Sequence, residues 1–147
     1  MPTDRSAALA RLEPLLGEWV VEASIAPGLA GRAVFEWALG GAVLLERSEA
    51  PDPAPDALTI IAPDEAGDGY RQHYFDSRGV VRLYAMTFGD GAWTLLFTSP
   101  DFTPLSFAQR YTGAFSADGR TIEGRWEKSD DGDASWELDF ELSYRRP

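Results

Sequence analysis

The feature that most constrains the fold is a series of short β-prone runs that begins at Gly17. Gly, Pro, Asp and Ser interrupt these runs at intervals of roughly ten residues, a spacing typical of an all-β barrel or sandwich. We expect ten strands, over residues 17–25, 31–39, 42–49, 57–62, 70–76, 80–88, 92–98, 107–115, 121–128 and 136–144. The prediction is one closed, antiparallel, ten-stranded barrel.

The segment before the first strand has a different periodicity. Residues 6–16 place Leu9, Leu12 and Leu15 at helical spacing, and Gly17 ends the pattern. We therefore expect one short helix across one end of the barrel. The 147 residues form a single domain, with the helix in 1–16 and the barrel in 17–147, and a chain of this length needs no crosslink to stabilise its core.

The charge balance argues against several classes of partner. Lys and Arg number 13 against 24 Asp and Glu, which gives a net charge of −11. Such a surface repels nucleic acid and anionic membranes, and no apolar run reaches the roughly 20 residues of a spanning helix. The N-terminal segment does not resemble a signal peptide, so the expected location is cytoplasmic. The single His cannot form a His-rich metal site, and no metal or other cofactor is expected.

A hairpin is predicted at Asp90-Gly91, the strongest short turn signal in the chain. With these two residues as the loop, cross-strand pairs on one apolar face follow: Phe88 with Trp93, Met86 with Leu95, Tyr84 with Phe97, and Arg82 with Ser99. Alternate residues in a strand point to opposite sides, so this face is assigned to the barrel interior.

A second two-residue turn at Arg78-Gly79 extends this register to the preceding strand. It places His73 opposite Tyr84, Phe75 opposite Arg82 and Arg71 opposite Met86, so that the only His points inward. A one-residue slip would reverse every side chain of that strand.

The C-terminal strands alternate clearly. The side chains expected to point inward include Gln109, Tyr111 and Trp126. In the last strand they are Trp136, Leu138, Phe140, Leu142 and Tyr144. A barrel of ten strands is wider than one that its side chains can fill, and we expect an interior cavity.

Several motifs resemble known families. Leu16-Gly17-Glu18-Trp19 resembles the Gly-x-Trp opening of the lipocalin and fatty-acid-binding superfamily, the calycins, whose Trp packs across the barrel floor. The runs His73 to Val80, Gln109 to Gly113, Gly124 to Glu127 and Trp136 to Arg145 resemble a bacterial lipocalin-like domain family of unknown function. The chain is also similar in outline to the nitrobindins, ten-stranded barrels whose haem is bound by a His near the C-terminus. The final strand here has no His, so no haem is expected.

Arg82 and Tyr84 give the sharpest indication of function, because one intervening residue places both on the same inward face. A guanidinium inside an apolar barrel needs a partner, which is either an anionic ligand or one of two acids, Glu46 and Glu36. The remaining alternative is that Arg82 lies in water at the rim of the barrel. We expect the barrel to bind a small apolar or amphipathic molecule, with an anion favoured. The predicted contacts are His73, Arg82, Tyr84, Phe75, Met86, Trp93, Phe97, Gln109, Tyr111 and Trp126.

Two alternatives belong to other classes. One is a lyase or isomerase acting on a small aromatic or carboxylic acid in the same cavity, with His73 or Tyr84 moving the proton and Arg82 orienting the carboxylate. The other is a structural homodimer whose barrel is filled by its own side chains. His73 itself could be a ligand contact, a base or a core residue.

Overall fold

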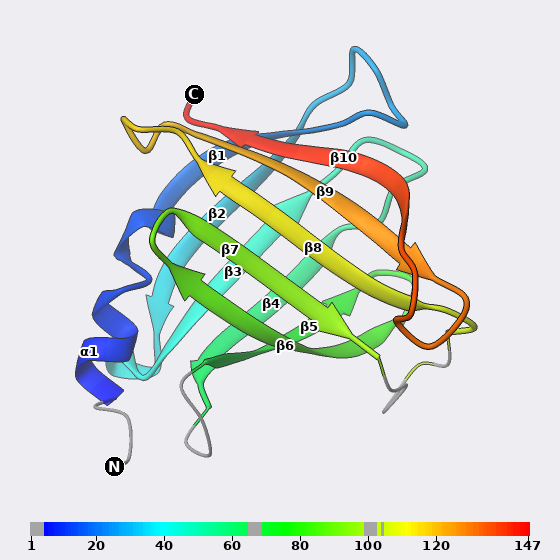
Figure 1. Cartoon of the computed structure of the whole chain (residues 1–147). Coiled ribbons are helices and arrows are strands. Elements are labelled where there is room, and N and C mark those ends of the chain that lie inside the picture. The colour runs from blue at the N-terminus through cyan, green and yellow to red at the C-terminus, as the bar shows by residue number, and fades with distance from the viewer. Residues whose placement is uncertain (1–4, 65–68, 99–102, 104) are drawn as a thin grey trace.

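A computed structural model of the chain describes residues 5–64, 69–98, 103 and 105–147. It is a closed barrel of ten antiparallel strands, in which each strand pairs with its neighbours in the chain and the first pairs with the last (Figure 1). The all-β prediction is confirmed, and every expected strand end lies within two residues of the observed one. The strands are β1 (Gly17–Ala23), β2 (Gly31–Ala38), β3 (Val43–Glu49), β4 (Ala57–Pro63), β5 (Tyr70–Asp76), β6 (Val81–Gly89), β7 (Ala92–Phe97), β8 (Ala108–Phe115), β9 (Thr121–Ser129) and β10 (Glu137–Arg145).

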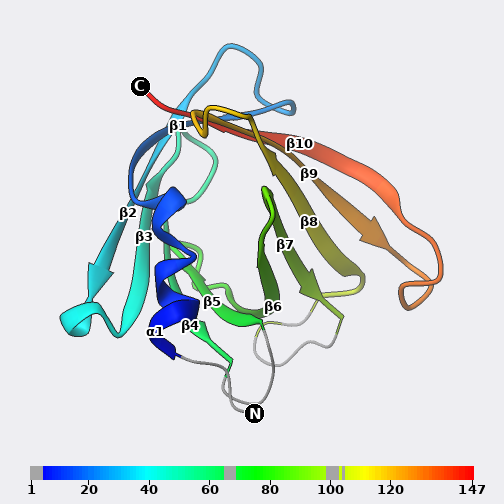
Figure 2. The same cartoon turned by 60° about the vertical axis from the view of Figure 1, so that its left-hand side comes forward.

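The N-terminal segment lies at one end of the barrel, beside β4 (Figure 2). The expected short N-terminal helix is confirmed, with a break before its last turn: α1 covers Arg5–Ala10 and a 3₁₀ turn, η1, covers Glu13–Leu15. Pro14 explains the break, because a proline has no N–H for the carbonyl four residues earlier and its ring collides with that carbonyl, here that of Ala10. Leu12 and Leu15 are nevertheless fully buried in the barrel core.

Trp19 forms the floor at this end. Its indole N–H donates to the carbonyl of Leu15 at 2.8 Å, and the guanidinium of Arg146 lies 3.7 Å from its ring centroid. Arg146 also donates to the carbonyls of Glu18 and Pro14, both at 3.1 Å. These contacts join the two ends of the chain, as expected of a Trp that packs across a barrel floor.

The Asp90-Gly91 hairpin has the predicted register. Phe88 pairs with Trp93 and Met86 with Leu95, and both Asp90 and Gly91 have positive φ angles. Arg82, Tyr84 and Met86 are consequently buried on the inner wall. The expected partner of Arg82 on the next strand, Ser99, lies outside the described residues.

The register predicted for β5 against β6 is wrong by one residue. The loop contains three residues, Ser77 to Gly79, because the N–H of Asp76 donates to the carbonyl of Val80 at 3.1 Å and Gly79 adopts the left-handed conformation at φ 83°. Loops of this kind end with a left-handed residue that glycine supplies without strain. The additional loop residue shifts β5 by one position against β6, which exchanges its inward and outward side chains. His73 therefore pairs with Leu83 and not with Tyr84.

The start of β10 also departs from the predicted alternation. A bulge between Leu138 and Phe140 leaves Leu138 opposite Glu127 and Phe140 opposite Trp126. The extra residue turns Leu138 outward, where it is 56% exposed. Trp136 lies on the same outer side, because its ring packs against the guanidinium of Arg110 at 4.4 Å.

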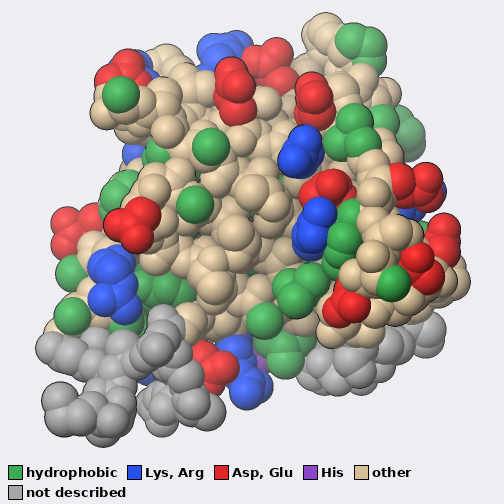
Figure 3. All heavy atoms as spheres, in the orientation of Figure 1, with side chains coloured by type: hydrophobic (Ala, Val, Ile, Leu, Met, Phe, Trp, Pro, Cys, Tyr) green, Lys and Arg blue, Asp and Glu red, His purple; other side chains and the backbone are tan. Residues whose placement is uncertain are grey.

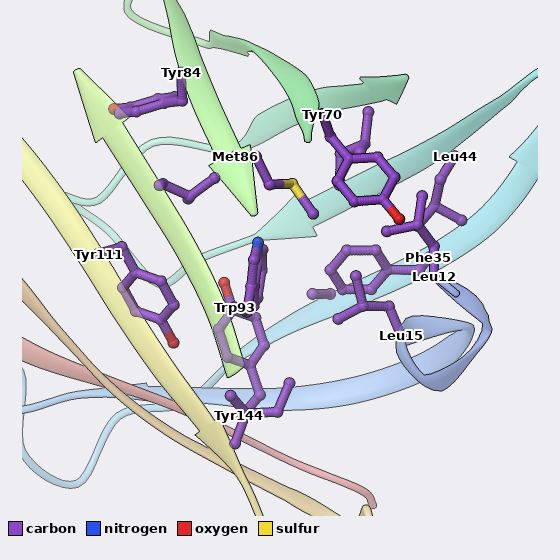
Figure 4. Packing of buried hydrophobic residues seen from close by; sticks show 14 of the residues in the cluster. Leu12, Leu15, Phe35, Leu44, Tyr70, Tyr84, Met86, Trp93, Tyr111 and Tyr144 are labelled. Atoms are coloured by element: carbon purple, nitrogen blue, oxygen red, sulfur yellow. The ribbon is translucent and has the colours of Figure 1, made fainter. Parts of the chain in front are cut away.

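Aromatic side chains fill the half of the barrel nearest the floor. Figure 4 shows Trp93 between Tyr111 and Phe35, with Tyr84 further along the barrel. The ring centroid of Trp93 lies 5.4 Å from that of Tyr111 and 6.2 Å from that of Phe35. The candidate site lies on the inner wall around Tyr84.

Candidate functional site

Five of the predicted contacts form one cluster on the inner wall, contributed by β6, β7, β8 and β9. The Tyr84 ring lies 5.8 Å from that of Phe97 and 5.6 Å from that of Trp126. The Tyr84 hydroxyl donates to Oε1 of Gln109 at 3.1 Å. The guanidinium carbon of Arg82 is 5.7 Å from the centroid of Phe97. We call Arg82, Tyr84, Phe97, Gln109 and Trp126 the Arg82 cluster.

Arg82 is the most unusual member. Its side chain lies on the inner wall and the residue is 9% exposed, yet no described residue offers a hydrogen-bond acceptor to its buried Nη1. Burying a charge without a partner is costly. We refer to Nη1 of Arg82 as the open donor.

Neither acid considered as a partner pairs with this donor. Glu36 is exposed on the outer wall, where the Arg47 side chain donates to it at 3.5 Å. Glu46 is buried, but the strand pairing places it three strands from Arg82, in the cross-strand row Glu46, Thr59, Tyr74, Arg82. Neighbouring strands lie about 4.8 Å apart, so this row spans roughly 14 Å along the sheet.

Glu46 is a functional candidate that the sequence analysis did not place. It is 7% exposed, and burial raises its pKa to about 7, although a hydrogen bond with Thr59 opposes the rise. Burial, followed by the negative form of Glu46, raises the pKa of the Tyr111 and Tyr144 hydroxyls. A carboxyl group with a pKa near 7 can accept or release a proton at physiological pH.

The tyrosines of the site are neutral hydrogen-bonding groups. Burial raises the pKa of Tyr84 to about 12, and the positive charge of Arg82 only partly opposes it. Burial and the nearby Asp76 carboxylate raise the pKa of Tyr74, whose hydroxyl donates to that carboxylate at 2.8 Å. Tyr84 therefore supplies a neutral phenol beside the open donor.

Gln72 is a second residue that the sequence analysis missed. It pairs with Tyr84 across β5 and β6 and is 5% exposed on the inner wall. Its Oε1 is buried and has no hydrogen-bond partner among the described residues. We refer to it as the open acceptor. The correct loop length at residues 77–79 would have placed both Gln72 and Tyr74 inside.

Three other predicted contacts are packed in the core. Met86 and Trp93 are each 1% exposed. Tyr111 covers Gly124 so closely that a Cβ at that glycine would overlap the phenol, and its hydroxyl donates to the carbonyl of Leu142 at 3.2 Å. Their packing stabilises the wall next to the Arg82 cluster.

His73 and Phe75 do not share the inner wall with Arg82. In the observed register His73 pairs with Leu83, and Phe75, which is 36% exposed, pairs with Val81. Their predicted inward orientation is therefore wrong, because the three-residue loop shifts β5 by one position against β6. A hollow of about 240 Å³ lies beside Phe75, lined also by Leu58 and Asp76.

A larger hollow lies on the outer side of β7 and β8. It has a volume of about 460 Å³ and is bordered by Arg110, Thr112 and Trp136. Acidic and basic side chains are interspersed over the face of the molecule seen in Figure 3. Within the described ranges, no helix is long and apolar enough to cross a membrane, and no group of three His, Cys, Asp or Glu side chains is arranged to hold a metal ion.

The fold can be compared with known proteins only in outline. The closed ten-stranded antiparallel barrel fits a calycin or lipocalin-like fold at that coarse level. No protein-family model matches the sequence, and no curated protein matches it.

Proposed function

We propose that this protein is a lipocalin-like binding protein that holds a small amphipathic carboxylate inside the barrel. The observation that carries the proposal is the open donor of Arg82, a buried guanidinium nitrogen with no acceptor among the described residues. A ligand carboxylate would supply the missing acceptor. Arg is suited to this task because its planar fork matches the geometry of a carboxylate.

The neighbours of Arg82 support an amphipathic ligand. Tyr84 is a neutral phenol next to the guanidinium, and Phe97 and Trp126 pack against Tyr84 with apolar rings. Binding sites for small molecules commonly combine such an apolar wall with a few polar groups that fix the orientation. The carboxylate would therefore bind at Arg82 and the apolar tail would contact the aromatic rings.

The test is the displacement of a fluorescent fatty-acid analogue by ligands of equal chain length. Octanoate carries the carboxylate, whereas octanamide and octan-1-ol are uncharged controls. Octanoate should displace the analogue at a concentration roughly 30-fold lower than either control, which corresponds to about 2 kcal/mol for a desolvated charge pair. Equal displacement by all three ligands, or no binding of the analogue, would overturn the proposal.

A second candidate is an enzyme in the same barrel, and Glu46 is the observation that favours it. With a pKa of about 7, Glu46 can remove a proton from a part of the ligand remote from the carboxylate at Arg82 and return it. Incubation of 7-oxooctanoate, whose ketone is remote from the carboxylate and acidifies the neighbouring C–H bonds, in D₂O would then give deuterium beside the ketone, detected by NMR, in the wild type and not in Glu46→Gln. No exchange above the rate of the free acid would exclude this activity for that substrate.

A further inference from the structure

The open donor and the open acceptor are close neighbours on the inner wall. Gln72 pairs with Tyr84, and Tyr74 pairs with Arg82, so Gln72 and Arg82 occupy diagonal positions on β5 and β6. Diagonal residues on one face of an antiparallel pair are about 7–8 Å apart. The two side chains therefore start from neighbouring positions on the same wall.

The two positions have complementary requirements. Nη1 of Arg82 requires an acceptor, and Oε1 of Gln72 requires a donor; both atoms are buried, and neither has a partner among the described residues. Buried polar atoms in native proteins are almost always hydrogen-bonded, so two such atoms on diagonal positions point to a ligand that satisfies both. A simple fatty acid satisfies only the first.

We propose that the site selects carboxylic acids that carry a hydroxyl group on the carbon next to the carboxylate. This inference rests on the proposed function and specifies its ligand class. The carboxylate accepts from Arg82, and the hydroxyl donates to Oε1 of Gln72. In a 2-hydroxy acid the acceptor and the donor are separated by only two carbon atoms, which suits the short distance between the two side chains.

A neutral hydroxyl fits this position better than an ammonium group. Gln72 has no charge, the guanidinium of Arg82 would repel a second cation, and the Asp76 carboxylate on the same strand already accepts from Tyr74 and Arg78. Glu46, the buried acid of the same wall, lies three strands away from Arg82. A 2-amino acid should therefore bind more weakly than the corresponding 2-hydroxy acid.

The experiment compares octanoate, 2-hydroxyoctanoate and 2-aminooctanoate in the same displacement assay. Wild type should bind 2-hydroxyoctanoate about fivefold more tightly than octanoate, the typical gain from one net hydrogen bond, and should bind 2-aminooctanoate most weakly. Gln72→Met removes the acceptor at similar size, and it should reduce the preference for the hydroxyl to about onefold. Arg71→Met is the control, because Arg71 lies next to Gln72 on the same strand but is exposed and pairs with Asp64, and it should keep the fivefold preference.

The outcomes separate the two proposals. If octanoate does not bind better than octanamide, the proposed function itself fails. If octanoate binds in preference to octanamide and wild type does not distinguish it from 2-hydroxyoctanoate, only the hydroxyl inference is wrong. The wild-type comparison needs no variant, so it remains decisive even if Gln72→Met does not fold. A fivefold preference that survives in folded Gln72→Met would also contradict the assignment to Gln72.

Discussion

Gln72 lies directly opposite Tyr84 on the inner wall of the barrel. This pairing places the open acceptor, the neutral phenol and the open donor of Arg82 on two adjacent strands. It also turns His73 to the outer side, so the polar groups of the candidate site come from Arg, Gln, Tyr and Glu side chains.

The position of His73 gives the first prediction. His73→Ala should change the affinity for octanoate by less than about twofold, because the side chain shares its face with Leu83 and not with Tyr84. Displacement titrations of the variant and of wild type give the comparison. A tenfold loss of affinity would show that His73 faces the ligand and that the β5 register is incorrect.

The second prediction concerns the pH dependence of stability at Glu46. Burial raises its pKa in the folded protein from 4.5 to about 7, so the folded state binds this proton more tightly than the unfolded chain. The contribution of this proton to the free energy of unfolding is fully present below pH 4.5, the pKa in the unfolded chain, and is lost as the pH rises through about 7. It amounts to about 3 kcal/mol.

Glu46→Gln stays neutral at every pH and does not lose this contribution. The unfolding free energy of the variant minus that of wild type should therefore rise by about 3 kcal/mol as the pH goes from 4 to 8. Urea titrations across this range measure the difference. Glu123→Gln, at an exposed position on β9, is the control and should show a nearly constant difference. A constant difference for Glu46→Gln as well would mean that Glu46 is hydrated in the folded protein.

Arg146 should contribute to stability through the floor of the barrel. Arg146→Met removes two hydrogen bonds to backbone carbonyls and the contact with the Trp19 ring, which together predict a loss of about 1–3 kcal/mol. Arg145→Met removes only an exposed ion pair with Glu22, which is worth about 0–1 kcal/mol. Thermal melts of the two neighbouring variants should therefore differ clearly, and equal melting temperatures would contradict the structural role of Arg146.

Gly124 should be intolerant of a side chain. A Cβ there would overlap the hydroxyl and ring of Tyr111, whereas a Cβ at Gly113 would meet Ile122 and Tyr111 at about 3.0 Å. Gly124→Ala should cost about 1–3 kcal/mol and Gly113→Ala should cost less. Urea unfolding tests this order, and the reverse order would mean that Tyr111 does not cover Gly124.

Local turn signals determined how much of this architecture could be predicted. Asp90-Gly91 specifies a two-residue loop, and the register of β6 against β7 followed from it. Arg78-Gly79 gives no such specification, because glycine at the third position of a three-residue loop is equally compatible with the sequence. That single residue decided whether Gln72 or His73 faces the interior.

Other features depend on tertiary packing and have no local signal. Glu46 lies in Leu44-Leu45-Glu46-Arg47, where two apolar residues precede two charged ones and no alternation identifies the inner face. The bulge that turns Leu138 outward is visible only in the pairing of β10 with β9. The Pro14 break in the helix, in contrast, was predictable from the sequence by the proline rule.

The most direct test of the central claim is the affinity for octanoate and the unfolding free energy of Arg82→Met, measured together. Arg82→Met should bind octanoate at least roughly 30-fold more weakly than wild type, and without ligand it should be no less stable, because replacing a buried charge by an apolar group is often neutral or stabilising. Arg125→Met, at an exposed arginine on the outer wall, should leave both quantities unchanged. Wild-type affinity in Arg82→Met, or a loss of several kcal/mol of stability without ligand, would contradict the account and identify Arg82 as a structural residue.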